Sequence, residues 1–532
     1  MRGDGNGRLT ILSEAEKAAL YGIPGFDDFQ RVEFFAMSEA ERSLGLQRRG
    51  VLKQLYCLLQ IGYFKAKQAF FRFSLDGVPP EDVTFLLQRY FHGEALIVGP
   101  LNAKEYYAQR REIVALSGYR LWTDNDLPAL RDKATLLART DVPPTFLLAE
   151  LMVFLIGQRI VRPGYPTLQT IIRGALSAER ERLEQAVEAA LTDATREVLQ
   201  QLPVHESTLS DLAAIKQDAK SFRYRQMGLD RQKRLTLAPL YAIAKALLPS
   251  LGLSQLNIAY YASLANFYTV YDLRRFKPGQ TNLYFLCYAW QRYRHLTDNV
   301  AEAFCHHARQ LEDGTKAVAN RQAAQIHNER QQATPRVGEL LLLYVDDSLA
   351  DATPFGTVRH RAFGIMPEEK LRSTGKLLTG KPVSQMDLRW QAVDRQSGLC
   401  TKNLRPLAMA LDFASNGASG KVWLAALQWM KEVFARRQRL AKQPLAEIPP
   451  RTMPKRLRDF LPGFDLDGKP DGLRGDRYEF WVCRHLRKRL GGGDIYLDDS
   501  VRHRHFADDL VSLGGQGGRT QSAGHPLAAP AG

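Results

Sequence analysis

Paired aspartates are the residues of this chain whose type and spacing could support metal-dependent chemistry. Asp346 and Asp347 follow three leucines in the stretch LLLYVDDSL. Paired carboxylates of this kind bind the magnesium ions of nucleotidyl-transfer enzymes. Such a turn needs a third carboxylate on a neighbouring strand, whereas the surrounding sequence predicts helices. A metal-dependent nucleotidyl-transfer enzyme is therefore kept as an alternative interpretation.

A second acidic group lies near the carboxyl end of the chain. It comprises Asp498, Asp499, Asp508 and Asp509. The group has the composition of a two-metal nuclease site, but it precedes a stretch with almost no large apolar side chains. Because such a stretch cannot bury a core, we expect these carboxylates to be solvated or to face a partner.

Composition and charge favour a polyanionic partner. The 532 residues carry a formal net charge of +16 and have a pI near 9.5, which is typical of proteins that bind nucleic acid or an acidic membrane surface. No apolar run reaches the ~18 to 20 residues that span a bilayer, and the amino terminus does not resemble a signal peptide. The five cysteines are far apart and form no CxxC pair. We therefore expect a cytoplasmic protein with reduced thiols and no membrane partner.

Basic side chains alternate with aromatic ones between Gln47 and Phe73, and this segment is the leading candidate for phosphate contact. Its sequence, QRRGVLKQLYCLLQIGYFKAKQAFFRF, contains no acidic residue. Apolar residues recur at helical spacing, so one face can pack on a core while the cations near the start stay in water. The alternative is a helix whose charges only solvate its outer face. The candidate DNA-contacting residues here are Gln47, Arg48, Arg49, Lys53, Lys65, Lys67 and Arg72.

Two later helical segments add candidates. A helix that begins after Asn102 carries basic residues on its outer face, and an apolar helix over residues 143–160 is followed by the turn VRPGYP and a helix capped by Thr167. The second pair is compatible with a helix-turn-helix, whose second helix would enter a major groove, although any helical hairpin satisfies this spacing. The residues expected to point into the core from the last helix are Leu168, Ile171, Ile172, Ala175 and Leu176. The candidate DNA-contacting residues are Arg110, Arg111, Arg120, Arg159, Arg162, Thr167, Gln169 and Arg173.

Caps, turns and composition predict a mainly α-helical chain of several domains. Ser13 with Glu16 and Ser38 with Glu41 form capping boxes that open short helices. Residues 331–339, QQATPRVGE, are predicted to be a linker, and the aromatic stripes before them favour packing in a core or dimer interface over base stacking. The expected organisation is helical DNA-binding domains at 1–96 and 97–178, the second helix-turn-helix-like, a long-helix linker or dimerisation region at 179–334, a helical scaffold at 335–445, a basic linker leading toward a further domain at 446–513, and a disordered tail at 514–532.

Several blocks of the sequence resemble the amino-terminal half of transposases of the Tn-three family of replicative transposons. The blocks are ILSEAEKAALYGIP, QRRG with YCLLQIGYFKAKQAFF, YAQRREIVALSGYR, RIVRPGYPTL, YVDDSLADATPFGTVRHRAF and YEFWVCRHLRKRLGGGDIYLDDSVRHRHFADDL. They follow the family's order from about Leu9 to Leu513. The resemblance implies that the early helical units recognise the terminal inverted repeats of a transposon and that the later helices serve dimerisation and scaffolding.

The sequence departs from the family after Leu513. In the family an RNase H-like domain follows, with an Asp, Asp, Glu trio that binds magnesium, whereas this chain continues into a low-complexity tail. The resemblance therefore implies a truncated, non-catalytic fragment without a cofactor of its own, since magnesium would belong to the missing domain. Its expected partners are the double-stranded DNA of the inverted repeats and, as a homodimer or mixed dimer, a full-length transposase that it would assist or inhibit. The expected location is the nucleoid of a bacterial cytoplasm, and a nonspecific DNA-binding assembly protein is a further alternative.

Overall fold

The structure is a computed structural model that describes residues 10–92, 94, 99, 101–201, 215–273, 275–380, 383–464, 470–505 and 507. These residues are mainly α-helical, as the sequence predicts, and their strands occur as two antiparallel pairs. The chain forms two compact units, Met1–Asp211 with Leu240–Gln291 and Leu212–Pro239 with Arg292–Gly532. The expected boundaries after residues 178 and 334 lie inside helices, whereas those after residues 96 and 513, and the expected tail, lie outside the described residues.

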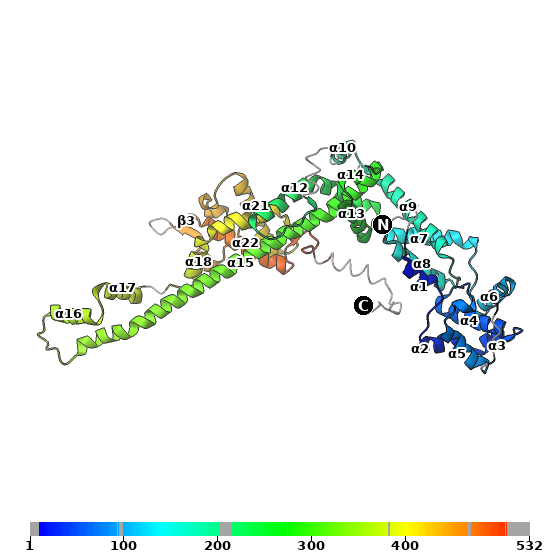
Figure 1. The fold of residues 1–532 in the computed structure, drawn as a ribbon. Coiled ribbons are helices and arrows are strands. Elements are labelled where there is room, and N and C mark those ends of the chain that lie inside the picture. The colour runs from blue at the N-terminus through cyan, green and yellow to red at the C-terminus, as the bar shows by residue number, and fades with distance from the viewer. Residues whose placement is uncertain are drawn as a thin grey trace. The chain divides into compact units, whose positions relative to one another are not determined.

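The first unit begins with a bundle of helices packed around α4 (Figure 1). Its helices are α2 (Asp28–Phe35), α3 (Glu39–Leu46), α4 (Val51–Lys67), α5 (Pro80–Tyr90) and α6 (Ala103–Ser117), whereas α1 (Glu14–Tyr21) packs Leu20 and Tyr21 on the second core described below. The capping boxes predicted at Ser13 and Ser38 are confirmed, because each serine accepts a hydrogen bond from the third backbone N–H while the glutamate there accepts from the cap. Local sequence thus determines where these short helices start.

Helix α4 is the centre of this first bundle. Ten consecutive residues, 55–64, are buried, so the helix is covered on all sides. The polar members of this run have partners: the amide of Gln60 donates to that of Gln109 at 2.6 Å, and the Tyr63 hydroxyl donates to Asp82 at 2.8 Å. Helix α4 is therefore a core helix, and the expectation of a surface helix with one packed face is wrong.

A second bundle in the same unit consists of three helices around their own core. They are α7 (Leu127–Thr140), α8 (Pro144–Gly157) and α9 (Tyr165–Ala190). The chain before α1 joins this core, because the backbone N–H groups of Ile11 and Leu12 donate to the Tyr165 hydroxyl at 3.2 and 3.3 Å. The described remainder of the unit includes α10 (Asp193–Gln201), α13 (Gln255–Phe267), α14 (Val270–Leu273) and segments of α12 (Tyr224–Leu247) and α15 (Pro278–Leu342).

The second unit packs its helices against α22 (Gly475–Gly491) and the middle of α15. Its other helices include α16 (Phe355–Ile365), α17 (Glu368–Thr379), α18 (Gln385–Arg395), α19 (Ser397–Leu399), α20 (Arg405–Ala410) and α21 (Ala418–Ala435). Strand β1 (Phe413–Ala414) pairs with β4 (Tyr496–Leu497), and β2 (Pro462–Phe464) pairs with β3 (Pro470–Leu473). The linker predicted at residues 331–339 is wrong, because this stretch belongs to α15, which contains Pro335 within its last turns. Among the described helices none is long and apolar enough to cross a bilayer.

Close packing at Gly62 of α4 gives a test of the first bundle. A Cβ atom at Gly62 would lie 2.3 Å from the ring of Phe35, so Gly62→Ala should overpack the core and lower the free energy of unfolding by about 1–3 kcal/mol. Gly174 in α9 is the matched control, because a Cβ there meets nothing within 4 Å, and alanine should leave stability unchanged or raise it by up to about 1 kcal/mol. Urea denaturation followed by circular dichroism measures both. Equal midpoints for the two variants would contradict the packing argument.

Candidate nucleic-acid interface

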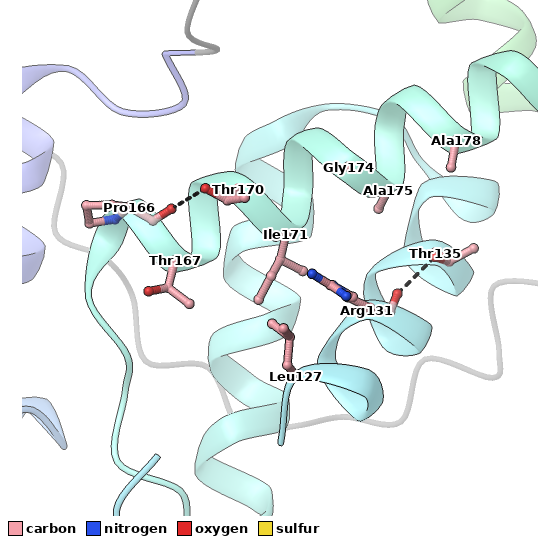
Figure 2. Close-up of a pocket in the computed structure, with 10 residues that line it drawn as sticks. All are labelled: Leu127, Arg131, Thr135, Pro166, Thr167, Thr170, Ile171, Gly174, Ala175 and Ala178. Atoms are coloured by element: carbon pink, nitrogen blue, oxygen red, sulfur yellow. Dashed lines mark hydrogen bonds between the residues drawn. The ribbon is translucent and has the colours of Figure 1, made fainter. Parts of the chain in front are cut away.

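A groove lies between α7 and α9 in the second bundle (Figure 2). Its volume is about 670 Å³, and it is lined by Leu127, Arg131, Thr135, Pro166, Thr167, Thr170, Ile171, Gly174, Ala175 and Ala178. Arg131 is the charged residue among these ten, and Figure 2 shows it extending from α7 toward α9. The α9 side of the groove is built from small residues, so the helix backbone lies close to the surface. The groove is thus positively charged and shallow enough for a polyanion to approach the helix.

The start of α9 is fixed by the turn that precedes it. The helix begins at Tyr165 with Gly164 as its N-cap, and Pro166 lies in the first turn, where a missing N–H costs nothing. The expectation that Thr167 caps this helix is therefore wrong. Thr167 lies within the first turn, where its N–H donates to the Gly164 carbonyl at 3.0 Å and its side chain lines the groove.

One face of α9 packs on the core and the opposite face is exposed. Leu168, Ile171, Ile172 and Ala175 are buried and Leu176 packs against the same core, as predicted. Thr170, Arg173 and Gly174 are exposed, and they lie at the helical spacing of one stripe. In the described part of the chain neither Arg131 nor Arg173 forms an ion pair, so both charges are available to a ligand.

The turn between α8 and α9 is tied to the segment that leads into α7. Arg159 adopts the left-handed conformation, with φ of 52°, that ends α8, and its carbonyl accepts from the Arg120 N–H at 2.9 Å. The Arg120 guanidinium in turn donates to Asp126 at 2.5 and 2.9 Å. This hydrogen bond lowers the pKa of Asp126 to about 2. The exposed Arg159 and half-exposed Arg120 therefore fix the conformation of this loop through their hydrogen bonds.

Among the cations near the start of α4, one forms ion pairs within the protein and the others are exposed to solvent. Arg48, expected to stay in water, is only 17% exposed because it forms ion pairs with Glu105 at 3.5 Å and with Glu112. That expectation is wrong. Arg49 and Gln47 are exposed, and Lys53, 45% exposed, lies 3.9 Å from Glu105. The outer surface here is formed by Arg49 and Lys53.

Three other candidate cations hold the first unit together. The Lys65 ammonium donates to the Ala36 carbonyl at 2.8 Å, the Lys67 ammonium to the Ala19 carbonyl at 2.7 Å, and the Arg162 guanidinium to the Leu20 carbonyl at 3.2 Å. Burial lowers the pKa of both Lys67 and Arg162, and the neighbouring Arg162 charge lowers that of Lys67 further. Their hydrogen bonds therefore join α1 and the end of α2 to α4 and to the α8–α9 turn.

The candidates of α6 lie among aromatic side chains. The Arg110 guanidinium lies 5.1 Å from the ring centre of Phe70, and that of Arg72 lies 5.6 Å from the ring centre of Tyr107, whose hydroxyl it also contacts. Arg111 is exposed. Cation–π contacts of this kind orient a guanidinium while leaving its charge in place. The last candidate, Gln169, is half-buried on α9.

The acidic pairs do not assemble into a metal site in the described residues. Asp346 lies in a turn after the short helix η4 (Leu343–Val345), where it accepts from the Ser348 N–H at 3.0 Å and lies 3.7 Å from Arg361. Asp498 and Asp499 follow strand β4, and Asp508 and Asp509 lie outside the described residues. No group of three or more histidine, cysteine, aspartate or glutamate side chains that could hold a metal ion occurs in the part of the chain that the structure describes.

Arg131 is the groove residue that sequence reasoning misses. Helix α7 buries Leu130, Ala134 and Leu137. Arg131 directly follows Leu130 in the sequence and therefore lies on the face that borders the buried one. The helical period alone could place Arg131 beside the core. It could not show that α9 packs against that side of α7, because this contact joins residues distant in sequence.

The Arg120–Asp126 pair predicts a pH dependence. The pKa of Asp126 is lowered from 3.8 to about 2 in the folded chain, so the pair stabilises the fold above about pH 4 and its contribution is lost as pH falls toward 2. Asp126→Asn should therefore lower the urea midpoint at pH 7 and approach the wild type as the pH falls toward 2. Asp124→Asn, in the same turn and exposed, is the control and should match the wild type throughout. A constant difference between wild type and Asp126→Asn from pH 7 to 2 would contradict this assignment.

Comparison with known proteins bears on the same region. Residues 11–175 match the family model described as a domain of unknown function (DUF4158), which covers both bundles up to the groove-lining start of α9. A comparison with curated proteins finds no match. The matched domain is one that occurs in transposases of the Tn-three family.

Proposed function

We propose that the first unit binds double-stranded DNA and recognises the terminal inverted repeats of a Tn-three-type transposon. The observation that carries this proposal is the exposed face of α9, where Arg173 and Thr170 lie beside a groove whose other wall carries Arg131. The match of residues 11–175 to a domain that occurs in Tn-three family transposases supports the choice of transposon DNA. The net charge of +16 supports a polyanionic partner.

The proposed docking places α9 in the major groove. A major groove about 12 Å wide admits one α-helix, whose diameter with side chains is about 10–12 Å. Small side chains at Thr170, Gly174 and Ala178 bring the α9 backbone close to the base edges, while Arg131 and Arg173 meet phosphates at the groove walls. Gln169 and Thr170 supply side chains that hydrogen-bond to bases. Arg49, Lys53 and Arg111 on the first bundle extend the phosphate contact.

The proposal assigns end recognition, and not strand transfer, to the described residues. A nucleotidyl-transfer site would need a third carboxylate near Asp346 and Asp347, and Asp346 instead accepts from the Ser348 N–H and lies 3.7 Å from Arg361. In this proposal the magnesium-binding chemistry of transposition comes from a catalytic RNase H-like domain. We therefore propose that the described units act together with a full-length transposase, as helper or inhibitor.

Dimerisation is proposed at the end of α15 in the second unit. Large apolar side chains there are between 60% and 72% exposed, at Leu341, Leu342, Tyr344, Val345 and Phe355. Large exposed apolar side chains that lie close together in the sequence favour a protein–protein interface. The proposed occupant is the same surface of a second copy of this chain or of a full-length relative.

Paired substitutions test the DNA-binding face. Arg131→Gln with Arg173→Gln should weaken binding to inverted-repeat DNA and flatten the dependence of log K on log salt by roughly 1.8, about 0.9 for each lost phosphate contact. Arg436→Gln, an exposed cation at the end of α21, is the matched control and should leave both unchanged. Fluorescence anisotropy across a salt series measures both quantities. Equal losses in the two proteins would remove the groove as the binding site, and equal affinity for scrambled DNA would favour the nonspecific assembly protein.

Charge placed on the exposed apolar surface tests the dimer. Leu342→Glu with Tyr344→Glu should shift a dimer to monomers in sedimentation-velocity experiments, because burying a carboxylate without a partner is costly. Leu399→Glu, at a residue 50% exposed on α19, is the control and should leave the association unchanged. Sedimentation as a dimer with both charges present would exclude this surface as the interface.

A further inference from the structure

A small pocket in the second unit has the features of an anion site. It lies between α18, α22 and the short helix η8 (Lys455–Leu457), and its volume is about 170 Å³. It is lined by Met386, Arg389, Trp390, Val393, Arg456, Leu457, Phe480, Trp481 and Arg484. Three arginines and three aromatic rings thus surround a space that is too small for a duplex.

The charges around this pocket are strongly unbalanced. Glu312 of α15 compensates part of this charge, because Arg484 donates to it at 2.8 Å and Arg389 lies 3.4 Å away. The same carboxylate also pairs with Arg487 at 2.8 Å, with Lys316 at 3.4 Å and with Lys488 at 4.0 Å. Five cations therefore share Glu312, of which Lys316 also lies 3.9 Å from Asp313, and Arg456 adds another cation at the pocket.

The excess of positive charge also lowers the pKa of neighbouring groups. Burial raises the pKa of Glu312, but the hydrogen bond and charge of Arg484 and the charges of Lys488 and Lys316 bring it down to about 2. The pKa of His485 is lowered to about 3 by burial and by the charges of Arg484 and Arg489. An anion entering the pocket would gain from the same field.

The charged side chains of the pocket are all hydrogen-bond donors, namely the guanidinium groups of Arg389, Arg456 and Arg484. Arg456 is exposed, whereas Arg389 and Arg484 are oriented by Glu312. Among the described residues that line the pocket none is acidic, so an anion there would meet donors and apolar surface.

We propose that this pocket binds one phosphate group, held by Arg389, Arg456 and Arg484. Guanidinium groups bind phosphate oxygens through charge-assisted hydrogen bonds. The phosphate comes either from a free mononucleotide or from the 5′-phosphorylated end of a DNA strand. The site is independent of the proposed α9 interface, because all of its residues lie in the second unit.

Equilibrium dialysis of the full chain tests the site with four probes. They are deoxyadenosine monophosphate, deoxyadenosine, and a single-stranded hexanucleotide with and without a 5′-phosphate. The phosphorylated member of at least one pair should bind about tenfold more tightly than its unphosphorylated partner. Selectivity in the mononucleotide pair identifies a free nucleotide as the ligand, and selectivity confined to the hexanucleotides identifies a strand end.

Matched variants connect this selectivity to the pocket. Arg456→Gln should reduce the affinity for the phosphorylated probe about tenfold, because it removes a charge-assisted hydrogen bond. Arg458→Gln, two residues from Arg456, exposed and outside the pocket, should leave it unchanged. The Arg131→Gln, Arg173→Gln protein should also keep this binding, which separates failure of the pocket from failure of the duplex interface. Equal binding of phosphorylated and unphosphorylated probes, or equal losses in Arg456→Gln and Arg458→Gln, would overturn the proposal.

Discussion

A charged side chain that leaves water must gain a partner, and this requirement decides which basic residues of the first unit remain for a ligand. Lys65, Lys67 and Arg162 give their donors to backbone carbonyls, so their charges hold neighbouring segments of the unit together. Arg131 and Arg173 lie at the groove beside α9 and stay in water. Basic residues that look equivalent in the sequence are thus separated by burial into structural cations and surface cations.

In the second unit the buried group that must gain partners is a carboxylate and not a cation. Its Glu312 carboxylate is only 3% exposed, and Arg484, Arg487, Arg389 and Lys316 converge on it. A single buried carboxylate can orient several guanidinium groups but cannot neutralise them. The remaining positive charge lies beside aromatic rings, which provide no hydrogen-bond acceptors for the guanidinium groups. Helix α22, which carries both the aromatic and the basic residues, therefore builds the core and the charged pocket together.

Local features of this fold are predictable from the sequence, and the contacts between distant segments are not. The caps at Ser13 and Ser38 depend on residues three positions apart, and they occur as expected. Pro335 predicts a break, yet α15 continues through it to Leu342, although the missing N–H removes one backbone hydrogen bond of the helix. Arg48 pairs with glutamates more than fifty residues away, and the place of Arg131 depends on how α9 packs on α7. No period in the sequence encodes these two contacts.

The two proposed surfaces differ in how water reaches their charges. Arg131 lines an open groove and Arg173 is exposed on α9 beside it, so salt screens both charges and counterion release from a duplex dominates the free energy of binding. Arg484 is 16% exposed and fixed by Glu312, so a phosphate that reaches it has left most of its water behind. Charge-assisted hydrogen bonds in such a site are stronger and less sensitive to salt. The excess of positive charge in this chain therefore acts in two ways: over long range at the first unit, where it attracts a polymer, and over short range at the second, where geometry selects a single phosphate.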